Sequence, residues 1–264
     1  MKLRKFLLAT LLVGIGIGLA SGAGRTALAA GPVEPAISAD ASSALAQMGK
    51  TLGAPAFSFQ ARTIRVYSDA SNQSLHIEHT FKITVRRPDR LLVDGVGDDG
   101  ATKVMYDGMT LAMVLVDQKQ YVSIPVPDTL RGMMQVAVGH FGVDFPLADF
   151  IIDAADKAFL TGVTAGQEVD TATIDGVLCR HLVFTQPPGI QLELWVEKTD
   201  QSLPRRLIVT YRSLPGQPIF VADMSDWNFS VHPADADFVY QPQEGVVRQD
   251  LTPQTAVAAP GAKP

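Results

Sequence analysis

Three side chains that can bind a metal ion lie close together in the sequence: His76, Glu78 and His79. They fall in residues 75–85, where apolar and polar residues alternate with the period of a half-buried β-strand. This alternation places His76 and Glu78 on the polar face and His79 on the apolar face. Because two ligands on one exposed face make only a weak adventitious site, the sequence favours a solvated strand face over a metal centre.

His79 is unusual because it interrupts an otherwise apolar row. Two interpretations stay open. His79 can be a histidine near a strand end that is hydrogen-bonded to the backbone, or a polar group inside an apolar cavity.

A second cluster of possible ligands, Asp94, Asp98 and Asp99, lies among glycines. A calcium loop needs oxygen ligands at regular alternate positions and a closing carboxylate, so we interpret these aspartates as turn residues. The sequence has no G-x-S-x-G elbow, no glycine-rich phosphate loop and no H-E-x-x-H pair. We therefore expect no catalytic residue, no metal and no cofactor, in a protein that is not an enzyme.

Cys179 is the single cysteine, so the chain cannot form an internal disulfide. Alternation along its strand sends the neighbouring Arg180 to the opposite face, which leaves the thiol without a cation beside it to activate it. We expect Cys179 to be a small buried core residue.

The first 29 residues have the pattern of a cleavable secretory signal peptide. Basic residues at positions 2, 4 and 5 precede an uncharged apolar run over residues 6–20, and Ala27-Leu28-Ala29 supplies a cleavage site after Ala29. Removing four basic residues and no acids takes the net charge of the chain from −5 to −9. An acidic exported chain is a poor candidate for binding nucleic acid. We also expect that the chain is not an integral membrane protein.

The mature chain is expected to comprise a linker over residues 30–37, one domain over 38–249 and a disordered tail over 250–264. A helix is expected over 38–52, capped by Ser38, and two more over 128–138 and 146–158, with Asp128 capping the first of these and Gly139 ending it. Ten to eleven strands joined by short hairpins fill the rest, so neighbouring strands should pair in sequence as an antiparallel meander. A meander of this length closes into a barrel or curls around something.

Several short motifs recur, in the same order, in periplasmic proteins with the LolA/LolB-like fold. The chain most closely resembles an uncharacterised family of predicted periplasmic proteins over roughly residues 40–245. The motifs are Phe57-Ser58-Phe59-Gln60, Phe81-Lys82-Ile83 before Arg87-Pro88, Tyr106-Asp107-Gly108, Asp175-Gly176-Val177, Leu194-Trp195-Val196, Leu203-Pro204-Arg205-Arg206 and Asp226-Trp227-Asn228.

The resemblance implies a mainly β fold, in which a half-open antiparallel barrel wraps around a few helices and encloses a hydrophobic cavity. It also implies a location in the periplasm and no enzymatic activity. Relatives with this fold carry lipoproteins across the periplasm or sense them at the envelope.

Our leading hypothesis is a periplasmic protein that binds an apolar ligand: a lipid, an acyl chain or a lipidated protein. Candidate ligand-binding residues are the apolar residues expected on the inner strand faces and on the helix over 128–138, which either packs as core or also closes over the ligand. They are Phe59, Phe81, Ile83, Met113, Leu115, Leu192 and Leu194 on strands, and Leu130, Met133, Met134 and Phe141 on the helical segment.

Two alternatives remain. One is an envelope scaffold or sensor that acts through contacts with a protein partner and binds no ligand. The other is a hydrolase whose site the sequence does not reveal.

Overall fold

The computed structural model describes residues 36–250, except 69–70, 72 and 142–144, and leaves the side chains of His140 and Phe141 undescribed. The expected signal peptide, most of the linker and the tail beyond residue 250 therefore lie outside the described residues. All described residues belong to one compact unit. The expected domain boundaries at 38 and 249 stay predictions.

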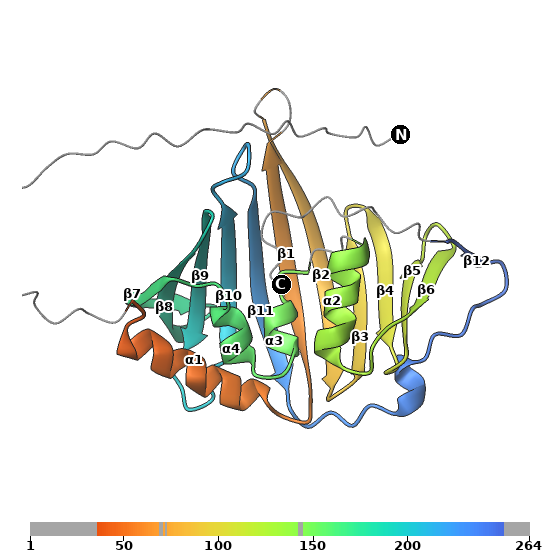
Figure 1. Cartoon of the computed structure of the whole chain (residues 1–264), viewed down its shortest axis with the longest axis horizontal. Coiled ribbons are helices and arrows are strands. Elements are labelled where there is room, and N and C mark those ends of the chain that lie inside the picture. Colours follow the sequence, from red (N-terminus) through yellow and green to blue (C-terminus); the bar gives the residue numbers. More distant parts are fainter. Residues whose placement is uncertain (1–35, 69–70, 72, 142–144, 251–264) are drawn as a thin grey trace, which may run out of the picture. The chain divides into compact units, whose positions relative to one another are not determined.

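A single open sheet of twelve strands forms the body, in the order β12-β6-β5-β4-β3-β2-β1-β11-β10-β9-β8-β7 (Figure 1). Two antiparallel meanders, β1 to β6 and β7 to β11, join where β1 pairs with β11. The strands are β1 (Ala56–Ser68), β2 (Ser74–Arg86), β3 (Arg90–Gly97), β4 (Gly100–Tyr106), β5 (Thr110–Leu115), β6 (Gln120–Pro125), β7 (Ala165–Ile174), β8 (Val177–Gln186), β9 (Ile190–Glu197), β10 (Pro204–Tyr211), β11 (Ile219–Asn228) and β12 (Val247–Arg248).

The expected fold class is confirmed, and the expected strand count of ten to eleven is wrong by the addition of β12. This two-residue strand pairs parallel with β6, so the sheet is antiparallel except at this edge. The Val247 amide donates to the Lys119 carbonyl at 2.9 Å, and the Gln249 amide donates to the Tyr121 carbonyl at 2.8 Å. A strand this short has no measurable period, which is why the alternation pattern does not predict it.

The helices lie together on one face of the sheet in Figure 1. They are α1 (Ala39–Leu52), α2 (Leu130–Phe141), α3 (Ala148–Ile151) and α4 (Ala155–Leu160), and a 3-10 turn, η1 (Asp235–Phe238), follows β11. The Ser38 side chain accepts a hydrogen bond from the Ala41 amide at 3.3 Å, which confirms it as the cap of α1.

Three expectations for the other helices are wrong. The cap of α2 is Thr129 rather than Asp128, because the Thr129 hydroxyl accepts from the Gly132 amide at 3.1 Å. Gly139 does not end α2, which continues to residue 141. The helix expected over 146–158 is two helices, because Ala154 adopts a left-handed conformation with φ of 52°.

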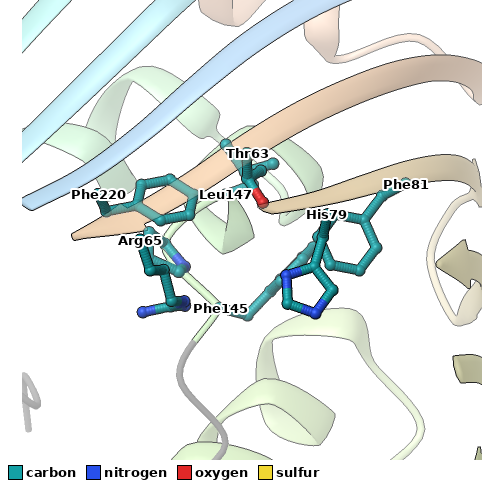
Figure 2. Close-up of a pocket in the computed structure, with 8 residues that line it drawn as sticks. Thr63, Arg65, His79, Phe81, Phe145, Leu147 and Phe220 are labelled. Atoms are coloured by element: carbon teal, nitrogen blue, oxygen red, sulfur yellow. The ribbon is translucent and has the colours of Figure 1, made fainter. Parts of the chain in front are cut away.

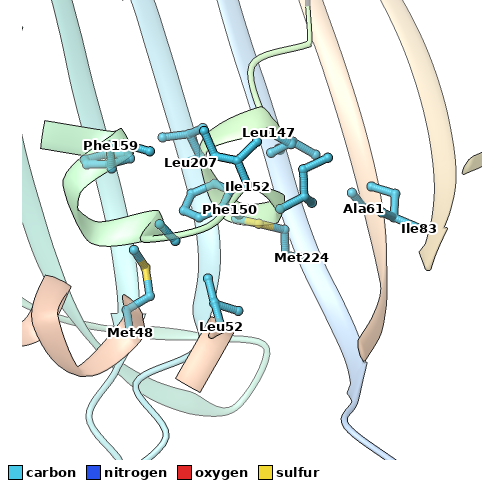
Figure 3. Close-up of a cluster of buried hydrophobic side chains, with 14 of the residues drawn as sticks. Met48, Leu52, Ala61, Ile83, Leu147, Phe150, Ile152, Phe159, Leu207 and Met224 are labelled. Atoms are coloured by element: carbon cyan, nitrogen blue, oxygen red, sulfur yellow. The ribbon is translucent and has the colours of Figure 1, made fainter. Parts of the chain in front are cut away.

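The core lies between the helices and the inner face of the sheet (Figure 3). Met48 and Leu52 of α1 and Phe150 of α3 are fully buried, as is Ile83 on β2. Each such side chain contributes about 1.5–3 kcal/mol when it is fully removed from water. The concave side of the sheet is therefore filled largely by side chains of its own chain.

The outer face of the sheet is polar and carries cross-strand ion pairs, such as Arg206 with Asp223 and Lys103 with Asp94. Cys179 lies on this side in a small separate cluster with Ile174 and Trp195. It is fully buried, as expected, and burial raises the pKa of its thiol.

Two glycines of β3 make room for side chains of β2. In the register of the sheet, Gly95 faces Phe81 and Gly97 faces His79. A Cβ at residue 95 would lie 2.7 Å from the Phe81 ring, and one at residue 97 would collide with the His79 ring and the Glu78 carbonyl. The aromatic rings therefore lie over the glycine backbone and supply the packing that a glycine side chain cannot give to the sheet.

We expect Gly97→Ala to lower the free energy of unfolding by about 1–3 kcal/mol, because backbone and ring must both move to admit the methyl group. Gly139→Ala is the matched control. A Cβ at residue 139 meets nothing within 4 Å, so alanine should raise stability by up to about 1 kcal/mol. Urea unfolding followed by circular dichroism measures both values, and equal effects at the two positions would contradict this packing.

Tyr106 ties β4 to the entry of α2, because its hydroxyl donates to the Pro127 carbonyl at 2.6 Å. Burial, with a smaller contribution from Asp89, raises its pKa to about 12. An unfolded tyrosine loses its proton near pH 10. The stabilisation linked to this proton is therefore complete below pH 10 and is lost as the pH rises from 10 to about 12.

We expect Tyr106→Phe to cost about 1 kcal/mol at pH 7, because a buried hydrogen bond is lost. The variant should also lose less stability than the unsubstituted protein between pH 9 and 11. Urea unfolding across this range tests the prediction, and parallel losses in the two proteins would refute the assignment of the raised pKa to Tyr106.

Candidate functional site

A cavity of about 140 Å³ lies on the inner side of the sheet, between three central strands and residues 145–147, which come directly before α3 (Figure 2). The described residues that line it are Thr63, Arg65, His79, Phe81, Phe145, Pro146, Leu147 and Phe220. Five of these eight side chains are apolar. The cavity therefore offers mostly hydrocarbon and aromatic surface with a few polar groups, the usual composition of a small-molecule site.

Strand register brings the cavity residues together. Thr63 on β1 pairs with His79 on β2, and Arg65 pairs with Phe220 on β11. Residues paired across antiparallel strands project from the same face, so these side chains share the inner surface. Phe145 and Leu147 reach the same space from the segment before α3.

Aromatic stacking organises one wall. The rings of His79 and Phe81 lie 5.4 Å apart between centroids and within 10° of parallel. Both rings rest against β3 at Gly97 and Gly95. The glycine positions therefore fix how far these two rings project into the cavity.

The polar groups of the cavity come from three side chains. The Arg65 guanidinium lies over the Phe220 ring at 5.0 Å from its centroid. His79 Nε2 lies 2.6 Å from a carboxylate oxygen of Asp99, an exposed residue that orients the imidazole. Thr63 is only 2% exposed. His79 therefore lines a mostly apolar cavity, as the second interpretation expects, and its partner is a carboxylate rather than the backbone group of the first.

An exposed apolar surface continues the inner face beyond the cavity. Along the β1–β2 pair, the next inner residues after Thr63 and His79 include Ile77, Leu75 and Tyr67. Leu75 is 52% exposed and Tyr67 is 39% exposed. We call Tyr67, Leu75 and Ile77 the hairpin track. It gives a ligand longer than the cavity an apolar surface on the same strands.

The predicted ligand-binding residues separate into three groups. Phe81 lines the cavity. Met113 and Leu115 lie on β5, where Met113 is half-buried and Leu115 is 37% exposed, and the Phe141 side chain lies outside the described residues. The remaining seven are buried in the core: Phe59, Ile83, Leu130, Met133, Met134, Leu192 and Leu194. Their role in binding stays a prediction.

Sequence reasoning missed most of the cavity. Continuing the inward row of β1 from Phe57 and Phe59 by twos reaches Thr63 and Arg65, so the alternation held a usable signal for those two. No local signal identifies Phe220 or Phe145, because their proximity depends on the pairing of β1 with β11 and on the path of a connecting segment.

The described residues contain no group of three or more His, Cys, Asp or Glu side chains placed to hold a metal ion. In the same part of the chain, no helix has the length and apolar character needed to cross a membrane.

Several solved structures resemble this one at low sequence identity. An uncharacterized conserved protein from Thermus thermophilus is 12% identical, with 80% of this chain and 99% of that chain covered and a TM-score of 0.47. The Mycobacterium tuberculosis lipoprotein LppX is 18% identical, with 72% and 97% covered and a TM-score of 0.43. The LolA superfamily protein NE2245 from Nitrosomonas europaea is 16% identical, with 75% and 96% covered and a TM-score of 0.40. We infer no ligand or partner from these likenesses.

The sequence itself matches one family model over residues 41–251, well over half of the 264 residues. That family is described as "Predicted periplasmic protein (DUF2092)". Among curated proteins, none matches the chain. The family match confirms the resemblance to an uncharacterised family of predicted periplasmic proteins, and the chain therefore belongs to the DUF2092 family.

Proposed function

We propose that this protein is a non-enzymatic periplasmic protein that binds an apolar ligand on the concave face of its sheet. The ligand would be a lipid, an acyl chain or the acyl group of a lipoprotein. The observation that carries the proposal is a cavity with five apolar lining residues, together with the exposed hairpin track farther along the same strands, β1 and β2.

The size of the cavity limits what it can hold. At about 30 Å³ for a water-sized group, 140 Å³ admits four or five such groups, so the cavity takes a ring or one end of a chain. At about 0.8 kcal/mol per buried CH₂, these groups supply about 3–4 kcal/mol, which corresponds to a millimolar Kd. A micromolar ligand must bury about five more methylenes, and the hairpin track is the adjacent apolar surface for them.

A scaffold or sensor that acts through protein contacts remains the second candidate. It is favoured by the filled core, because seven of the eleven predicted ligand-binding residues are packed against other side chains of the chain. In that case the cavity would be a packing defect and would bind no apolar probe.

We expect the protein, purified without detergent, to retain a co-purifying apolar molecule. Native mass spectrometry would show an added mass, and organic extraction would identify it as lipid. If the mass is that of the bare chain, and added fatty acid and phospholipid also fail to bind, the scaffold becomes the better explanation.

We expect Phe81→Glu to weaken binding of N-phenyl-1-naphthylamine, a neutral apolar fluorescent probe, by at least about ten-fold. When the probe binds, a carboxylate at residue 81 would lose its hydrating water, which costs free energy. If it keeps that water, the water occupies the cavity and excludes the probe. Lys82→Glu is the matched control, because it puts the same carboxylate on the next residue of β2, which is exposed. Titration of probe fluorescence measures both variants.

Phe145→Ala provides a second variant in case Phe81→Glu unfolds the protein. Phe145 is half-buried and lies outside the sheet, so its truncation should leave the cooperative unfolding transition intact while weakening probe binding several-fold. If folded Phe81→Glu, Phe145→Ala and Lys82→Glu all bind the probe like the unsubstituted protein, the cavity is not the binding site.

A further inference from the structure

We infer that the cavity selects a single-chain amphiphile with an anionic head group, a fatty acid being the simplest example, and that Arg65 binds the head group. This inference rests on the proposed function and adds the class of ligand. It starts from the polar residues of the cavity, which an unselective hydrocarbon site does not need.

The charges on the residues that line the cavity are of one sign, and the acidic Asp99 reaches it only as the partner of His79. Of the eight described residues that line it, Arg65 is always cationic and none is acidic. The whole chain carries 27 acidic and 22 basic residues, so a wall with this balance departs from the average surface. A positive charge beside an apolar cavity attracts an anion more strongly than the same charge in bulk water.

The surroundings of Arg65 strengthen this effect. Its cross-strand partners are apolar: Ile77 on β2 and Phe220 on β11. Arg65 is half-buried, and its guanidinium lies over the Phe220 ring, whose π face attracts the positive charge. A guanidinium has five N–H donors, so it can bind a carboxylate in addition to contacts that it makes within the chain.

His79 and Thr63 supply a second polar position nearby. They form a cross-strand pair one step from Arg65 on the same face, and Figure 2 shows the Arg65 and His79 side chains flanking the cavity from its two sides. Asp99 holds the imidazole from the solvent side at 2.6 Å. The polar side chains therefore lie on both flanks of the cavity, while Phe81, Leu147 and Phe220 provide the apolar walls.

The volume argues for one chain rather than two. About 140 Å³ receives only four or five methylene-sized groups, which is one chain end and not a pair. A single-chain carboxylate can place its head at Arg65 and bury its chain in the cavity and along the track. A ligand with two chains would leave the second one in water.

The test compares three probes that share a sixteen-carbon chain: hexadecanoate, hexadecanol and hexadecyltrimethylammonium. The purified full chain is first stripped of bound lipid, and each probe is titrated below its micelle concentration by displacement of N-phenyl-1-naphthylamine at pH 7.5. We expect hexadecanoate to bind at least about ten-fold more tightly than hexadecanol, and the ammonium probe to bind most weakly. Sodium acetate at millimolar concentration should not displace the probe, because the apolar chain is required.

Arg65→Met should remove the preference for hexadecanoate, so that hexadecanoate and hexadecanol bind the variant with equal affinity, because methionine keeps an apolar stem but has no charge. Arg62→Met is the matched control, since Arg62 lies on β1 but on the exposed outer side. It should keep the full preference. Circular dichroism and urea unfolding check that both variants fold.

The outcomes separate the inference from the function on which it rests. Equal affinity for hexadecanoate and hexadecanol, or equal effects of Arg65→Met and Arg62→Met, would overturn the head-group inference and leave apolar binding standing. Failure of every sixteen-carbon probe to bind would overturn the proposed function, and the inference with it. Displacement by acetate alone would show a simple anion site and would also overturn the inference.

Discussion

β1 pairs with β2 on one side and with β11 on the other, and this second pairing joins strands that lie about 160 residues apart in the chain. Without it, the two meanders would be separate sheets, each with an apolar face exposed to water. With it, they form one continuous inner surface whose apolar side chains must be buried. The helices bury them, because α1, α3 and α4 contribute their apolar residues to the same core as the inner strand rows. The long-range pairing therefore has to form before the core can be complete.

The same pairing makes the cavity. Arg65 and Phe220 face each other only because β1 and β11 are neighbours, and Thr63 faces His79 only because β1 and β2 are. Where α3 and α4 reach the sheet, Phe150 and Phe159 fill the space. Beside Leu147 the filling is incomplete, and the inner row of β1 changes from apolar to polar. The change in residue type coincides with the place where the chain stops packing on itself.

The sequence predicted those features that depend on local periodicity. The alternation over residues 75–85 correctly separates the exposed His76 from the buried Ile83, and the pattern around Cys179 correctly predicts a buried thiol. It could not predict the left-handed Ala154, because an alanine gives no sign of the turn between α3 and α4. The sequence pattern also led us to predict the most apolar residues as ligand contacts. Large apolar side chains such as Phe59 and Leu194 pack against one another in the core. The cavity instead includes polar side chains, such as Arg65, that do not pack into the core as closely.

The two edges of the sheet are both occupied by segments from near the ends of the described chain. At one edge, the Ser38 amide donates to the Gly166 carbonyl and the Gly166 amide donates to the Ala36 carbonyl, each at 2.9 Å. Farther along β7, the register shifts between Glu168 and Asp170, which interrupts the regular backbone pattern. At the other edge, β12 covers the start of β6. These segments cover part of each edge, so an intruding strand of another molecule would have to displace them before it could pair along the whole edge.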